Sequence, residues 1–135
     1  MPRFTDPKDL ERHLKKALDR LQAKTLIQVQ DEIGSLAISP YDTGRFRSSW
    51  FSKEGSPSSE VAPEGTDSPN TDATGLRVDS SKTYHLTNNL PYAQSVAIEG
   101  KVFTQSKNWF FDFTNARIPK IQESAARDVK QEFEL

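Results

Sequence analysis

The sequence predicts a single α+β domain: a long N-terminal helix and a kinked C-terminal helix pack on a small antiparallel sheet, with one long projecting loop. Three observations lead to this fold class. The chain begins and ends with helical periodicity, short alternating segments lie between, and a glycine- and proline-containing stretch interrupts those segments. At 135 residues the chain fits one domain spanning residues 1–135, because domains cluster at about 100–150 residues.

The first element is an amphipathic helix whose apolar residues recur at steps of three and four. Thr5 is the expected N-cap, and Pro7 stands in the first turn, where a missing N–H costs little. The helix is expected to end near Gly34. Its apolar stripe is formed by Leu10, Leu14, Ala17, Leu18, Leu21, Thr25, Leu26, Val29 and Ile33.

A second pattern on the same helix is a basic ridge that repeats every four residues. It consists of Lys8, Arg12, Lys16, Arg20 and Lys24. A solvated helix face explains the ridge most simply, and acids are interspersed along it. A binding surface for an acidic partner is the alternative, and a DNA-binding regulator would use the same residues.

The next segment is a turn at Asp42-Thr43-Gly44, followed by a short helical turn and a strand. Asp42 or Thr43 can cap the helical turn, and Gly44 permits a positive φ. Phe46 and Trp50 meet at i, i+4 spacing and are expected in the core. The strand is predicted from Trp50 to Lys53.

The stretch from Gly55 to Gly75 is predicted to be a long mobile loop. It contains three of the six glycines and three of the eight prolines, with serine, threonine and acids between them. Such a composition buries too little apolar surface to offset the chain entropy of ordering. Its four acids are Glu60, Glu64, Asp67 and Asp72, and it holds no basic residue.

After the loop the pattern predicts an antiparallel hairpin, with residues 76–78 and 83–87 as strands and 79–82 as the turn. Residues 92–98 fit either a short strand or one or two helical turns. The last third is helical, with Ser106 or Asn108 as the cap. Its two apolar stripes differ in direction by roughly 150°, so a break or kink is expected at Pro119.

The aromatic cluster Trp109-Phe110-Phe111-Asp112-Phe113 carries more aromatic surface than one helix face can bury. Phe111 is expected to point away from Phe110 and Phe113, toward a neighbouring subunit or the strand face.

Composition narrows the function classes. The net charge of −1 gives the whole chain no electrostatic drive toward nucleic acid. The absence of cysteine excludes disulfides and thiolate metal sites, and the two histidines, His13 and His85, lack a ligand pattern. No apolar run approaches the length of a membrane span, and no export signal follows Met1, so we expect a soluble protein of intracellular origin without cofactors.

Two blocks of sequence resemble the tail-completion, or head–tail joining, proteins of long-tailed phages. The first is Pro40-Tyr41-Asp42-Thr43-Gly44-Arg45-Phe46-Arg47-Ser48-Ser49, with Trp50 after it. The second runs from Asn88 through Leu90, Pro91, Tyr92 and Ala93 to Glu99-Gly100. The order of the elements is similar over most of the chain, but the loop between the blocks is longer and more polar than is usual in the family.

The resemblance implies a virion structural protein rather than an enzyme. Family members form homo-hexameric rings in the neck between head and tail, contact neighbouring neck and tail proteins, and let DNA pass through the lumen. The implied location is the virion, assembled in the host cytoplasm. Asp42, Thr43, Gly44, Phe46, Arg47, Trp50, Tyr92, Ala93 and Gly100 are then motif residues with architectural roles.

The Asp-Thr-Gly triplet also allows an aspartic-type hydrolase that uses Asp42. Two catalytic aspartates must share one proton. Arg45 and Arg47 would hold Asp42 ionised, and this disfavours the hydrolase. For assembly, the ridge from Lys8 to Lys24, the four loop acids and Phe111 are the candidate contacts between subunits.

Overall fold

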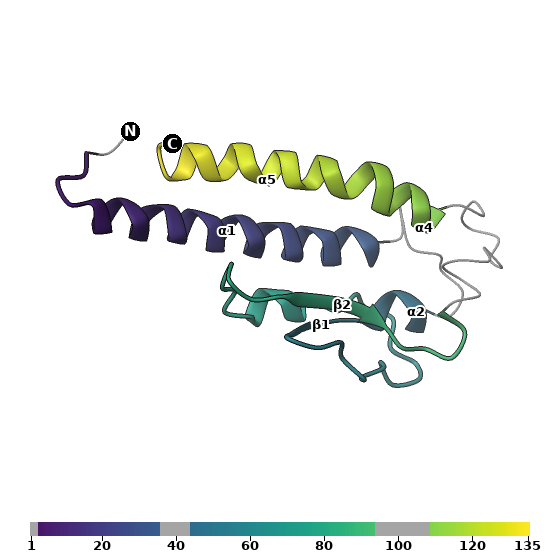
Figure 1. The fold of residues 1–135 in the computed structure, drawn as a ribbon. Helices are drawn as coiled ribbons and strands as arrows, with labels where there is room; N and C mark the ends of the chain where they lie inside the picture. The colour runs from purple at the N-terminus through teal and green to yellow at the C-terminus, as the bar shows by residue number, and fades with distance from the viewer. Residues whose placement is uncertain (1–2, 36–43, 94–108) are drawn as a thin grey trace.

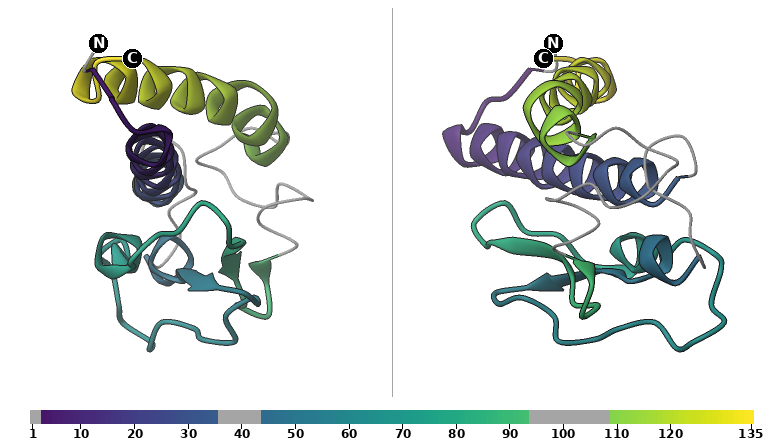
Figure 2. Two further views of the ribbon diagram at one scale, coloured as in Figure 1. Left: turned by 60° about the vertical axis from the view of Figure 1, so that its left-hand side comes forward. Right: turned by 90° about the vertical axis from the view of Figure 1, so that its right-hand side faces the viewer.

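The computed structural model describes residues 3–35, 44–93 and 109–135, and its architecture is α+β as predicted. Figure 1 shows three layers: the C-terminal helix, the long N-terminal helix α1, and a small two-stranded sheet with its loops. Helix α1 lies between the other two layers. The N- and C-terminal ends lie close together, as both figures of the whole fold show (Figures 1 and 2).

Helix α1 spans Pro7–Ile33 and ends before Gly34, as the periodicity predicted. Its N-cap is Asp6 rather than the expected Thr5. The Asp6 carboxylate accepts the backbone N–H of Lys8 at 2.9 Å, and Pro7 is the first helical residue. The prediction was one residue off because both side chains can cap, and a carboxylate also gains from the helix dipole.

The short helix α2 spans Arg45–Ser48 and leads into strand β1, Trp50–Glu54. Strand β2 spans Tyr84–Asn88 and pairs antiparallel with β1, with Ser52 opposite Leu86. The predicted partner strand at residues 76–78 is wrong, because these residues are not in a strand. Pairing with β1 instead lets β2 place Leu86 against the core beside Trp50.

The predicted turn at residues 79–82 is present, with the Lys82 N–H donating to the Asp79 carbonyl at 3.0 Å. The Tyr84 hydroxyl accepts the Asp79 N–H at 2.7 Å and so ties this turn to the start of β2.

The C-terminal helix continues through Pro119 by means of a π-helical turn. Helix α4 (Trp109–Asp112) runs through the π turn η2 (Phe113–Arg117) into α5 (Ile118–Glu132). The Ile118 N–H bonds to the Phe113 carbonyl, which is the wider i to i−5 spacing of such a turn. One inserted residue rotates the helix phase by about 100°. The turn therefore brings the two apolar stripes, predicted to diverge by roughly 150°, much closer to a common face.

The core joins all three layers through aromatic contacts. Phe46 meets Trp50 edge-on at 5.8 Å between ring centroids and Trp109 at 6.1 Å, so the predicted i, i+4 contact is confirmed. The cluster of buried residues is completed by Ile33, Leu90, Phe113 and Ile121. Tyr92 and Ala93 pack against this cluster from its rim.

Candidate functional site

The described part of the first motif begins at Gly44, which has the positive φ expected of it, +84°. Its carbonyl accepts both the N–H of Ser48 at 3.2 Å and the Ser48 hydroxyl at 2.8 Å. A side chain at Gly44 would also collide with the Asp67 carboxylate. Glycine is therefore required twice, once for the backbone angle and once for the close approach of the loop. Asp42 and Thr43 lie outside the described residues.

The two arginines of the motif bind the acidic loop. Arg45 donates from Nε to the Ala62 carbonyl at 2.8 Å, and its guanidinium lies 4.0 Å from Glu64. The Arg47 guanidinium lies 3.5 Å from the Asp67 carboxylate. Two of the four loop acids, Glu64 and Asp67, therefore face the motif.

Asp72, a third loop acid, anchors the loop inside the domain. Its carboxylate accepts the Ser52 N–H at 3.1 and 3.2 Å and the Gln30 side-chain amide at 2.5 Å. Gln30 is 1% exposed, and it also bonds the Trp50 carbonyl at 3.0 Å and the Ala73 N–H at 2.9 Å. Sequence reasoning missed Gln30, since a glutamine inside an amphipathic helix looks like any other polar position.

The loop therefore packs on the body of the domain and does not project freely, contrary to the expectation from its composition. Ser58, Ala62 and Ala73 are buried, and the short helix η1 (Asp72–Gly75) lies beside α1 and β1. The prediction counted large apolar side chains. The loop is instead held by polar bonds to Gln30 and Arg45 and by small buried residues.

The second motif block meets the first at the end of β2. The Asn88 side-chain amide donates to the Phe46 carbonyl at 2.8 Å. The Asn89 amide donates to the carbonyls of Ser58 and Glu60, so it holds the acidic loop as well. Gly100, the last motif residue, lies outside the described residues. The structure thus joins the two blocks through the bond from the Asn88 side chain to the Phe46 backbone, consistent with architectural roles for the described motif residues.

The basic ridge divides into two halves. Arg20 lies 3.5 Å from Glu132, and Lys24 lies 3.9 Å from Asp128, so these two side chains face acids of α5. Arg12 bonds Asp9 of its own helix at 2.9 Å. Two ridge residues therefore pair with acids of α5. The other three, Lys8, Arg12 and Lys16, are exposed.

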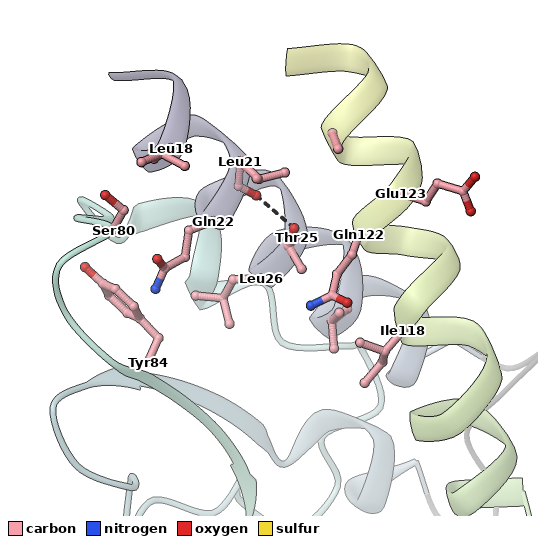
Figure 3. Close-up of a pocket in the computed structure, with 12 residues that line it drawn as sticks. Leu18, Leu21, Gln22, Thr25, Leu26, Ser80, Tyr84, Ile118, Gln122 and Glu123 are labelled. Carbon is pink, nitrogen blue, oxygen red and sulfur yellow. Dashed lines mark hydrogen bonds between the residues drawn. The ribbon is translucent and has the colours of Figure 1, made fainter. Parts of the chain in front are cut away.

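An apolar groove of about 880 Å³ lies along α1, which forms its floor. Figure 3 shows Leu21 and Leu26 of α1 between Ile118 of α5 and Tyr84 of β2. A second hollow of about 290 Å³ continues toward the chain termini and shares Leu18 and Leu21 with the groove. The remaining lining residues include Gln22, Thr25, Val29, Ser80, Gln122, Glu123, Ala126, Leu14, Val129 and Leu135.

Large apolar side chains stay exposed along this surface. Leu14 is 40% and Leu18 is 53% exposed, although both belong to the apolar stripe of α1. Phe111, at the other end of the C-terminal helix, is also exposed, at 44%, and its ring meets that of Phe110 edge-on at 6.2 Å rather than pointing away from it. The stripe of α1 is therefore longer than the surface that α5 and the sheet cover.

The described residues contain no cluster of three or more histidine, cysteine or acidic side chains fit to hold a metal ion. His13 Nε2 lies 2.7 Å from the Phe133 carbonyl, so it links the N-terminal part of α1 to the C-terminal end of α5. Among the described residues, no helix has the length and apolar character needed to span a membrane.

No family model, curated protein or solved structure matches this chain.

Proposed function

We propose that this protein is a virion structural component of the neck of a long-tailed phage. Copies of the chain form a homo-hexameric ring that joins the head connector to the tail, and genomic DNA passes through the lumen. The two motif blocks support the proposal by their resemblance to tail-completion proteins. The bond from Asn88 to the Phe46 carbonyl, which ties one block to the other, gives these residues a shared structural task.

The observation that carries the proposal is the uncovered apolar surface of α1 and α5. Only 34% of the residues are hydrophobic, so few are available to form a core. The chain nevertheless leaves Leu14 and Leu18 exposed beside a groove of about 880 Å³. Contiguous exposed apolar surface on a small domain is typical of a protein–protein contact. Covering this surface with the next subunit accounts for it.

The proposed action is assembly, meaning that subunits dock and no bond is made or broken. Gly44, Arg45 and Arg47 hold the acidic loop on the domain, and this leaves α1 and α5 as the face offered to a neighbour. Phe111 is a second exposed apolar contact, at the far end of the C-terminal helix.

Light scattering combined with negative-stain images tests the proposal. We expect the purified chain to form rings, and Leu18→Glu to prevent them because it places a charge in the centre of the groove. Val61→Glu is the matched control, because Val61 is a similarly exposed apolar side chain (39%) on the distant loop. A wild-type chain that stays monomeric at every concentration, or rings that survive Leu18→Glu, would contradict the proposal.

A further inference from the structure

The two outer edges of the sheet differ. In an antiparallel pair, alternate residues turn their N–H and C=O groups toward the partner strand or away from it. The Gly55 N–H bonds the Thr83 carbonyl at 2.8 Å, and the register then places Lys53 opposite His85 in the next bonded pair. Trp50 and Ser52 therefore point their backbone groups outward from β1, and Tyr84, Leu86 and Asn88 point theirs outward from β2.

The outer edge of β1 is closed by side chains. The Ser52 N–H donates to both oxygens of Asp72, and the Trp50 carbonyl accepts the Gln30 amide at 3.0 Å. In the left view of Figure 2, β1 lies between η1, which carries Asp72, and β2. No strand can add to this edge without displacing these bonds.

The outer edge of β2 is open. The outward backbone groups of Tyr84, Leu86 and Asn88 have no hydrogen-bond partner within the described parts of the chain. Unpaired strand edges are templates for another strand, and proteins commonly guard them with charged side chains or proline. The sequence Tyr84-His85-Leu86-Thr87-Asn88 has neither lysine, arginine, acid nor proline.

A cavity of about 300 Å³ lies against the same edge. Its lining includes four consecutive residues, Leu86, Thr87, Asn88 and Asn89. Successive strand residues face opposite sides of a sheet, and β1 occupies the other edge, so a hollow that touches all four follows the open edge. The remaining lining is apolar, formed by Phe46, Trp50, Ala93 and Phe110.

Trp50, which lines the cavity, carries a buried hydrogen-bond donor. Trp50 is 6% exposed and stacks on Phe110 at 6.2 Å, and its indole Nε1 has no acceptor among the described residues. Buried indole N–H groups usually find a partner.

We propose that the open edge of β2 is a docking site for an extended segment of a partner polypeptide. The partner strand pairs with the backbone of Tyr84, Leu86 and Asn88, and one of its large apolar side chains fills the cavity beside Phe110. Strand addition of this kind takes affinity from backbone bonds and specificity from side-chain pockets. Because the edge and the cavity carry no charge, they select an uncharged segment. The proposed ring interface lies mainly on α1 and α5, and Tyr84 is the residue that it shares with this docking site.

A capped seven-residue peptide of alternating threonine and leucine is the probe, added to the intact protein. Backbone amide exchange is followed residue by residue. We expect the peptide to slow exchange at Leu86 and Asn88 and to leave His85 and Thr87 unchanged, since these already bond β1. A peptide with aspartate in place of its central leucine, and one with N-methylated backbone at the bonding positions, should each bind at least about tenfold more weakly.

Three results would overturn the proposal. The alternating peptide could leave the exchange at Leu86 unchanged. The aspartate peptide could bind as well as the leucine peptide, in which case the cavity plays no part. Protection of Leu86 in the protein alone that disappears on dilution would show that a second copy of β2 closes the edge. The ring test with Leu18→Glu probes the surface of α1 and not the edge of β2, so the two proposals can fail separately.

Discussion

Gly44 shows at the level of one residue how the motif works. Its φ of +84° disfavours any side chain, and a Cβ there would meet Asp67. Gly55 has nearly the same φ, +83°, but nothing lies near the position of its missing Cβ. Substitutions at Gly44 and Gly55 can therefore be compared to separate the cost of backbone strain from the cost of steric collision.

We predict that Gly44→Ala destabilises the protein more than Gly55→Ala. Strain at a positive φ costs about 1 kcal/mol or more in both variants. Gly44→Ala adds an overpacking cost of about 1–3 kcal/mol, because the loop that carries Asp67 must move. Chemical denaturation of both variants measures the difference. Equal unfolding free energies would mean that the loop yields freely and that the motif does not hold it.

At the scale of elements, Asp72 and Gln30 fasten the loop to the sheet and to α1. Breaking a buried hydrogen-bond network leaves unsatisfied donors, which costs about 1–3 kcal/mol. Asp72→Ala leaves the Ser52 N–H without its acceptor. We predict that this substitution makes residues 55–75 the first site of limited proteolysis. Glu60→Ala is the control, because the structure gives the Glu60 carboxylate no bond within the described residues. Equal cleavage rates for wild type and Asp72→Ala would show that the loop is already open, as its composition alone suggests.

A second fastening joins α1 to the turn before β2. Lys15 Nζ lies 2.6 Å from Asp19 and 2.8 Å from Asp79, and Asp19 also accepts the Ser80 N–H at 2.7 Å. The hydrogen bond from Lys15 holds the pKa of Asp79 below its ordinary value of 3.8 and, together with the Ser80 N–H, lowers the pKa of Asp19. The same carboxylates raise the pKa of Lys15.

The sign of the pH dependence follows from the lowered pKa values. Their stabilising contribution is complete above the ordinary value of 3.8 and is lost as the pH falls through the lower folded-state values. We predict that Asp79→Asn has a lower melting temperature than wild type at neutral pH, and that the difference shrinks below about pH 3.8. Melting curves recorded from neutral to acid pH check this, and high salt should reduce the difference. A difference that does not vary with pH would contradict the ion-pair explanation.

For the whole molecule, the surface charges bear on the proposed assembly of copies into a ring. The exposed half of the ridge, Lys8, Arg12 and Lys16, carries positive charge along α1, away from the acids of α5. Docking of this half on an acidic surface of the next subunit or of an adjoining ring remains a prediction. Contact with DNA phosphates in the lumen is the competing view.

We predict that reversing Lys8, Arg12 and Lys16 to glutamate weakens ring assembly at low salt, because several exposed pairs of about 0–1 kcal/mol each are lost together. The exchange Arg20→Glu with Glu132→Arg is the control, since it keeps an ion pair between α1 and α5. Light scattering across a salt series measures the effect. The reversed variant could instead form intact rings at every salt concentration and lose the retention of DNA. That result would favour contact of these residues with DNA in the lumen.

The sequence by itself determined the elements whose signals are local. The periodicity of α1, the positive φ of Gly44, the spacing of Phe46 and Trp50, and the exposure of Phe111 all follow from backbone geometry and side-chain spacing within a few residues. The fold class followed as well, because long amphipathic helices at both ends limit how the middle can be covered.

Only the tertiary structure decided which distant groups meet. Nothing near β2 in the sequence says that it pairs with β1 rather than with residues 76–78, or that Gln30 bonds Asp72 across 42 positions. Within the domain, Glu64 and Asp67 face Arg45 and Arg47, and the composition of the loop does not specify these partners. The physical reason is that hydrogen bonds and ion pairs depend on geometry within about 3–4 Å. A local sequence pattern specifies which groups are available, and the packing of helices and sheet specifies which of them come within that distance.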